Sequence, residues 1–224
     1  MKVARKFLIP FESLLKSLGC EAIVQPEPDA SDDLAVDNQY PMYKCMSEII
    51  KFRENSQLTD VVFEAEGQKK PAHKVFLAAA SDYCKAQFLG AWGLQLKHEA
   101  TIVIEDISFK TLSTLIDYAY SGIFKVPEIS TSSSTDEVAD RLDDLLELLV
   151  ASDGWFMLSL HEQVDAHITR MGSLFVRPDN VGAVMKIAAE ANARRLVKRC
   201  HKFRAKNLNA VEAFEKDMAS AGTT

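Results

Sequence analysis

The chain has 224 residues, 47% of them hydrophobic and 26% charged, and its net charge is −6. A chain of this size buries a core without needing a disulfide or a structural metal, and its negative charge disfavours non-specific binding to nucleic acid or to an anionic membrane. The four cysteines form no CxxC pair, which is typical of reduced thiols and predicts a cytoplasmic or nuclear protein. They are Cys20, Cys45, Cys84 and Cys200.

The first 40 residues are predicted to hold a short amphipathic helix and an acidic, flexible linker. Apolar residues recur at helical spacing over residues 7–18. Residues 21–39 combine two prolines with several carboxylates, a composition that disfavours regular structure. No targeting segment is expected, because the apolar run near the start is broken and no small-residue cleavage site follows it. No stretch of the chain approaches the roughly 20 apolar residues of a membrane-spanning helix.

A second helix and a β-hairpin are predicted next. The helix spans residues 43–54 and carries an apolar stripe at helical spacing. This stripe consists of Met46, Ile49 and Ile50. From residue 58 the side chains alternate between apolar and polar, which predicts a strand. Gly67 and Gln68 are expected to form the turn, and residues 69–72 to return as the paired strand.

The middle of the chain is predicted to contain one helix, one strand and a second helix. Residues 75–88 have helical composition, and the short β-branched run over 101–105 indicates a third strand. The next helix spans residues 109–120 and is expected to end at Ser121 and Gly122.

The last third of the chain is predicted to be entirely helical. Ser134 and Glu137 form a capping-box sequence that opens a helix with a leucine-rich face. Asp153 and Gly154 interrupt it, and a further helix follows. Pro178 indicates the first turn of another helix, and a basic amphipathic helix ends the series. Because a few strands precede a run of helices, the order predicts an α+β fold.

Four blocks of the sequence, taken in order and at their spacing, resemble the BTB/POZ family. They are Leu58-Thr-Asp-Val-Val-Phe; Ala72-His-Lys-Val-Phe-Leu-Ala-Ala-Ala-Ser-Asp-Tyr-Cys; Ile104-Glu-Asp-Ile-Ser-Phe with Leu115-Ile-Asp-Tyr-Ala-Tyr-Ser-Gly; and residues 145–160. The signature positions are His73, Leu77, Ser81, Tyr83, Tyr120 and Gly122. Residues 177–207 resemble, more loosely, the first helices of a BACK domain.

The resemblance implies a BTB/POZ fold, in which helical hairpins flank a small β-sheet, followed by BACK-like α-helices. It divides the chain into the N-terminal helix and linker at 1–40, a BTB/POZ domain at 41–170, and a partial BACK-like region with a disordered C-terminal tail at 171–224. Asp60 matches the buried aspartate of the family, for which Lys74 and Arg53 are candidate partners. The alternative is that Asp60 is an ordinary capping or strand-end carboxylate.

Few residues suggest chemistry. His73 and Cys84 are the candidate pair for nucleophilic catalysis, but the family places structural residues there, which favours a buried apolar role for Cys84. The histidines do not cluster with cysteines at zinc-ligand spacing, and no glycine-rich cofactor motif is present, so no metal or cofactor is expected. The basic run over 194–206 is interpreted as the solvated face of a helix rather than a phosphate-binding surface.

The resemblance implies a non-catalytic module for protein–protein interaction and homo-oligomerisation. Because dimeric members of the family place an exchanged helix before the first strand, Met46, Ile49 and Ile50 are predicted to form the dimer interface. The alternatives are a substrate adaptor of a cullin-3 ubiquitin ligase and, more remotely, an enzyme of the Cys/His type.

Cullin-3 is expected to bind weakly or not at all. Family members that bind it carry a hydrophobic-x-Glu motif after the helix that here contains Phe88. Trp92, Gly93 and Leu94 occupy this place in the sequence and supply no carboxylate.

Overall fold

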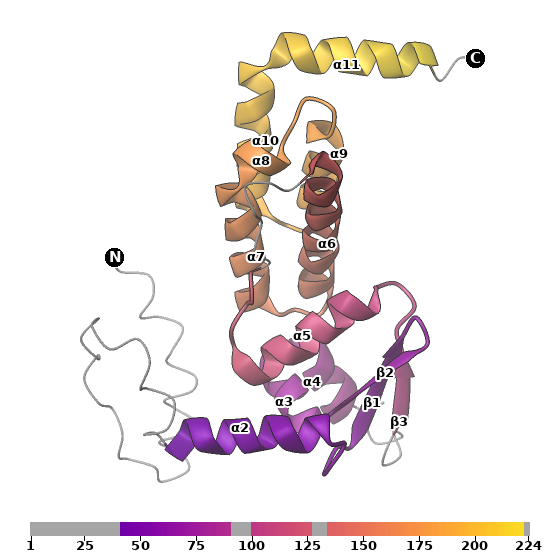
Figure 1. Cartoon of the computed structure of the whole chain (residues 1–224), viewed down its shortest axis with the longest axis vertical. Helices are drawn as coiled ribbons and strands as arrows, with labels where there is room; N and C mark the ends of the chain where they lie inside the picture. Colours follow the sequence, from indigo (N-terminus) through magenta and orange to yellow (C-terminus); the bar gives the residue numbers. More distant parts are fainter. Residues whose placement is uncertain (1–40, 91–99, 127–133, 222–224) are drawn as a thin grey trace, which may run out of the picture. The chain divides into compact units, whose positions relative to one another are not determined.

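A three-stranded sheet lies in the first part of the structure (Figure 1). Its strands are β1 (Val61–Ala65), β2 (Gln68–Ala72) and β3 (Ala100–Val103), in the order β2-β1-β3. β1 pairs antiparallel with β2 and parallel with β3. The alternation predicted for the first strand is confirmed, since its odd-numbered residues are buried. The turn lies one residue earlier than predicted, at Glu66 and Gly67, whose φ angles of 51° and 73° suit a two-residue hairpin of type I′.

Two helices stand where the sequence predicts one helix over residues 75–88. They are α3 (Lys74–Ala80) and α4 (Asp82–Leu89), separated at Ser81. Ser81 has extended backbone angles and its hydroxyl accepts a hydrogen bond from the Cys84 amide, as an N-cap residue does. The same hydroxyl donates to the carbonyl oxygen of Trp155 at 2.6 Å. The chain therefore bends at a residue whose side chain is bound to a distant segment.

The helices before and after the sheet agree closely with prediction. α2 (Pro41–Glu54) begins two residues before the predicted helix and ends at the same residue. α5 (Phe109–Ser121) is capped by Ser108 at its start and ends at Gly122, which has a left-handed φ of 64°. Only glycine adopts this conformation without strain, which explains a glycine at this position.

The capping box of the long helix α6 (Thr135–Gly154) is confirmed, with both reciprocal hydrogen bonds between Ser134 and Glu137 present. α7 (Leu158–Arg170), α8 (Gly172–Phe175) and α9 (Val181–Glu190) follow. The prediction that Pro178 lies in the first turn of a helix is wrong, because α9 begins three residues later. Asn180 stabilises the preceding turn instead, accepting from the Arg177 amide and donating to the Phe175 carbonyl.

Two helices end the described chain: α10 (Arg194–Lys206) and α11 (Leu208–Ala221). The second corrects the prediction of a disordered tail. α11 packs mainly against α10 and extends away from the other helices (Figure 1). Its one buried side chain among those described is Val211. The sequence analysis missed this helix, although Leu208, Val211, Phe214 and Met218 recur at helical spacing in it.

The structure, a computed structural model, describes residues 41–90, 100–126 and 134–221. The helix and linker predicted for the first 40 residues lie outside these ranges. By their contacts, the described residues from Cys45 onward form one compact unit. A continuous core runs from the sheet to the last helices, and α6 packs against α5, α7, α8 and α9.

Candidate interaction surface

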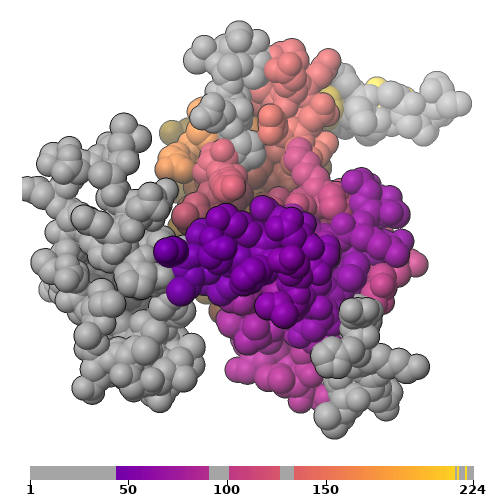
Figure 2. Space-filling view, turned by 60° about the horizontal axis from the view of Figure 1, so that its bottom comes forward, coloured from indigo at the N-terminus to yellow at the C-terminus, as the bar shows by residue number. Residues whose placement is uncertain are grey.

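The apolar stripe of α2 faces the domain that follows it. Met46, Ile49 and Ile50 are all half-buried, and the two isoleucines pack against the core. The helix lies on the surface and its outer side is open in Figure 2. Cys45 and Lys51 are exposed on it. The stripe predicted as a dimer interface is thus partly covered within a single chain and retains some exposed apolar area.

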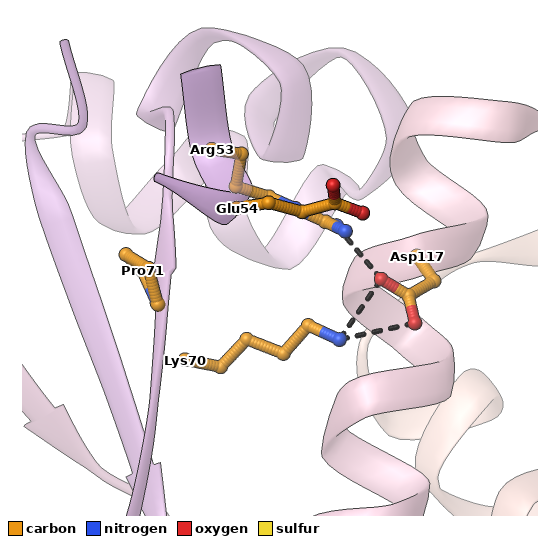
Figure 3. Close-up of a pocket in the computed structure, with 5 residues that line it drawn as sticks. All are labelled: Arg53, Glu54, Lys70, Pro71 and Asp117. Carbon is orange, nitrogen blue, oxygen red and sulfur yellow. Dashed lines mark hydrogen bonds and ion pairs between the residues drawn. The ribbon is translucent and has the colours of Figure 1, made fainter. Parts of the chain in front are cut away.

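A cluster of charged side chains ties the end of α2 to α5 and β2 (Figure 3). The Arg53 guanidinium lies 2.8 Å from a carboxylate oxygen of Asp117, and the Lys70 ammonium lies 2.9 Å from the same oxygen. Lys70 also contacts the Ser113 hydroxyl. The Arg53 side chain is 8% exposed, and charges so well buried are retained only when they are paired. The cluster therefore fixes the position at which α2 joins the domain.

Tyr120 lies at the centre of a second, mostly aromatic cluster beside this one. The ring of Phe76 stacks on it at 4.8 Å between centroids, and the Arg53 guanidinium carbon lies 4.6 Å from its centroid. Its hydroxyl accepts a hydrogen bond from the His73 amide at 2.7 Å. Burial raises the pKa of Tyr120 to about 12, so the hydroxyl stays protonated and able to donate.

The hydrogen-bond partners of the His73 ring, one of which is the Tyr120 hydroxyl, determine which of its nitrogens carries the proton. Nδ1 of His73 lies 2.7 Å from the Tyr120 oxygen and Nε2 lies 3.3 Å from the Gln57 carbonyl. Because a carbonyl only accepts, a neutral imidazole here carries its proton on Nε2 and accepts from Tyr120 at Nδ1. Both ring nitrogens are therefore engaged in joining structural elements.

Cys84 has none of the features of an activated nucleophile. It is fully buried in α4, and burial raises the pKa of its thiol to about 11. A catalytic cysteine needs a lowered pKa and a nearby base, whereas the bonds of His73 are made to Tyr120 and Gln57. This geometry gives no support to the Cys/His alternative.

Of the two candidate partners of Asp60, Lys74 is the one that it contacts. One carboxylate oxygen of Asp60 accepts a hydrogen bond from the backbone amide of Lys74 at 2.7 Å, at the start of α3. Arg53, the other candidate, pairs with Asp117 instead. Asp60 is half-buried rather than buried. A carboxylate at the first turn of a helix satisfies an amide that has no partner within the helix, which agrees with the capping alternative.

The remaining signature residues take different structural roles. Leu77 is part of the core, Ser81 caps α4, and Gly122 ends α5. Tyr83 is partly exposed, with its ring 6.0 Å from that of Trp155. Of the residues predicted for the cullin-3 loop, Phe88 is half-buried in α4, while Trp92 and Leu94 lie outside the described residues.

Two exposed apolar side chains that follow α6 were missed by the sequence analysis. Phe156, between α6 and α7, and Leu158, the first residue of α7, are 59% and 63% exposed. Phe156 has a φ of 51°, an uncommon conformation for an aromatic residue. Large apolar side chains that are exposed close together in the sequence are candidates for a protein-binding surface. The sequence signal was an aromatic pair directly after Gly154, but periodicity does not separate an exposed aromatic residue from a buried one.

A small cleft beside the charged cluster has a volume of about 220 Å³. It is lined by Arg53, Glu54, Lys70, Pro71 and Asp117 (Figure 3). Its two cations face two carboxylates, so it has no marked preference for an anion, and it is smaller than an ordinary ligand pocket. Within the described parts of the chain, no three His, Cys, Asp or Glu side chains are grouped to hold a metal ion. Nor does any described helix have the length and apolar character needed to cross a membrane.

Comparison with known proteins identifies the fold around these clusters. The sequence model of the BTB/POZ domain matches residues 49–171, more than half of the chain. The chain belongs to the BTB/POZ family. The α+β architecture implied by the sequence blocks is thereby confirmed, with its small sheet and surrounding helices.

Several characterised BTB/POZ proteins resemble the chain. It is 30% identical over 160 residues to BTB/POZ and MATH domain-containing protein 4 of Arabidopsis thaliana, covering 70% of this chain and 33% of that protein. It is 42% identical over 70 residues to mouse Kelch-like protein 26, and this match covers 31% of this chain and 11% of that protein. A solved BTB domain, that of zebrafish PATZ1, aligns with a TM-score of 0.45 at 22% identity over 57% of this chain and 90% of that one.

The chain thus spans a third or less of these curated relatives. What it shares with them is the BTB/POZ domain, a protein–protein interaction module. The clusters around Tyr120 and Asp117 are the internal supports of this module. Its candidate contact surfaces are α2 and the exposed residues Phe156 and Leu158.

Proposed function

We propose that the chain is a non-catalytic interaction module that dimerises through α2. The observation that carries this proposal is the half-buried state of Met46, Ile49 and Ile50. A helix of 14 residues is marginal alone in water, and its own domain covers the stripe only in part. A two-fold dimer uses the same patch from both chains and buries the remainder twice.

A dimer in which α2 keeps its place on its own domain is compatible with the charged cluster. Arg53 at the last turn of the helix stays paired with Asp117, while the preceding turns contact the second chain. Completing the burial of six half-buried side chains contributes roughly 4–9 kcal/mol. This is of the same order as the cost of association, about 4–15 kcal/mol. The dimer should therefore be sensitive to a single charged substitution on the stripe.

Light scattering after size exclusion tests the dimer at micromolar concentration. The expected result is a dimer mass for the natural chain, a monomer mass for Ile49→Asp, and no change for Lys51→Ser on the outer side. Circular dichroism checks that each variant is folded. A monomer mass for the natural chain, or an unchanged dimer in folded Ile49→Asp, contradicts the proposal.

Cross-linking at Cys45 provides a second test that leaves the stripe intact. Among the described cysteines only Cys45 is exposed, while Cys84 and Cys200 are buried. In a Cys20→Ser background, a short bismaleimide should join two chains if α2 lies at a two-fold interface. The matched Cys45→Ser variant should give no covalent dimer. Absence of cross-linking in a sample that is dimeric by light scattering places the interface elsewhere.

A cullin-3 adaptor is the second candidate function. Kelch-like and Kelch-repeat relatives share the domain, and the exposed residues Phe156 and Leu158 offer a surface on which a partner helix would pack. We nevertheless expect weak binding, because Trp92-Gly93-Leu94 supplies no carboxylate. Calorimetry with the N-terminal region of cullin-3 measures the affinity. Sub-micromolar affinity that Phe156→Asp abolishes would establish the adaptor function.

A further inference from the structure

The outer face of α10 carries an uninterrupted set of cations. Five basic side chains of this helix are exposed, and no ion pair with another described residue is present at any of them. They are Arg194, Arg195, Lys198, Lys202 and Lys206, called the α10 basic face below. Residues four apart lie on the same side of a helix, about 6 Å apart along its axis. Arg194, Lys198, Lys202 and Lys206 thus form one row of four charges, separated by three nearly equal steps, with Arg195 beside it.

The helix that carries this face is held rigidly. Asp165 of α7 is buried, and its two carboxylate oxygens accept hydrogen bonds from the Arg195 and Leu196 amides at 3.2 and 2.9 Å. The opposite side of α10 is anchored in the core by Leu196 and Cys200. The basic side chains therefore project from a fixed support, which reduces the entropy lost when a partner binds.

The charge of this face differs sharply from that of the rest of the chain. α10 contains seven Lys and Arg residues and no Asp or Glu. The net charge of the whole chain is −6, so the other residues together carry −13. Because charges are screened beyond about 8 Å at physiological salt, an acidic partner at α10 responds mainly to the local positive charge. A long polyanion such as duplex DNA would also extend over the rest of the chain, whose net negative charge repels it.

We propose that the α10 basic face docks an acidic protein segment in which carboxylates recur every three or four residues, as on one side of a helix. Carboxylates at this spacing would meet the cations along two or more helical turns. A protein segment is favoured over single-stranded nucleic acid because α10 exposes no Phe, Tyr or Trp ring on which bases stack. Phe203, the aromatic residue of α10, is half-buried against the core. This inference does not depend on the α2 dimer.

Fluorescence anisotropy with a designed probe tests the proposal on the full chain. The probe is a labelled alanine-based peptide of roughly four helical turns with glutamate at every fourth residue, and its glutamine counterpart is the control. We expect the glutamate peptide to bind, with at least a tenfold loss of affinity between about 50 and 300 mM salt. The double variant Lys198→Glu with Lys202→Glu should lose binding. Lys85→Glu with Lys125→Glu, which changes two exposed lysines elsewhere, should keep it.

Four results would overturn the proposal. Equal binding of the glutamate and glutamine peptides shows that charge does not recruit the ligand. Binding that survives the α10 charge reversal places the site elsewhere on the surface. Tighter, salt-dependent binding of a DNA duplex of similar length, lost in the same variant, assigns the face to nucleic acid. Salt-sensitive self-association that excludes the peptide assigns it to a second copy of the chain, which likewise contradicts the proposal.

Discussion

Replacing Tyr120 with phenylalanine tests whether one hydroxyl holds α5 against the segment that leads into α3. In the structure this hydroxyl accepts from the His73 amide and lies 2.7 Å from Nδ1 of the same residue. The substitution keeps the ring, and with it the stacking on Phe76, but leaves the buried amide and imidazole nitrogen without a partner. A buried polar group without a partner costs about 1–3 kcal/mol.

We therefore expect Tyr120→Phe to lower the free energy of unfolding by about 1–3 kcal/mol. For a chain of this size each kcal/mol lowers Tm by about 2–4 °C. Urea unfolding followed by far-UV circular dichroism and by the fluorescence of buried Trp155 measures both quantities. Tyr83→Phe is the matched control, because that tyrosine is partly exposed and its hydroxyl makes no hydrogen bond with a described residue. If the two variants unfold at the same urea concentration, the Tyr120 hydroxyl is not a structural support.

Three further outcomes follow from buried polar groups. Asp165→Ala removes the carboxylate that caps α10 and should cost about 1–2 kcal/mol, seen as a lower urea midpoint; an unchanged midpoint argues against the cap. Burial, and to a lesser degree the charge of Arg170, lowers the pKa of His167. The unfolded chain therefore binds this proton more readily than the folded chain, and the free energy of unfolding should fall as the pH drops from about 7 to 5. His167→Gln should flatten that dependence, and parallel pH profiles would exclude His167 as its source. The raised pKa and burial of Cys84 predict slow labelling by a thiol reagent in the native state while Cys45 reacts quickly; fast, pH-dependent labelling of Cys84 would revive the enzyme alternative.

Local sequence signals predicted much of the fold. The capping box at Ser134 and Glu137, the alternating first strand and the end of α5 at Gly122 all depend on residues a few positions apart. Such signals act within one turn or one strand, so they remain valid whatever the rest of the chain does. The family blocks then supplied the topology that local patterns do not contain.

Long-range contacts account for the errors. The break between α3 and α4 depends on the bond from Ser81 to Trp155, which are 74 residues apart. The sequence left two candidate partners for Asp60, because it does not reveal that the backbone amide of Lys74 lies beside the carboxylate. The Tyr120 cluster joins residues of α2, α3 and α5 that no periodic pattern links. The exposed Phe156 and Leu158 were missed for the same reason, since burial is a property of the assembled fold.

The contacts of the long helix α6 limit where the chain can be truncated. It contacts α5 on one side and α7, α8 and α9 on the other, and its leucines belong to the same core as Val61 and Leu196. Truncation at the edge of the family match, near residue 171, would strip apolar surface from α6 that α8 and α9 cover. The cooperative folding unit is accordingly larger than the stretch that the family model matches. A ligand that bound and stabilised the last helices would therefore also stabilise the sheet against unfolding.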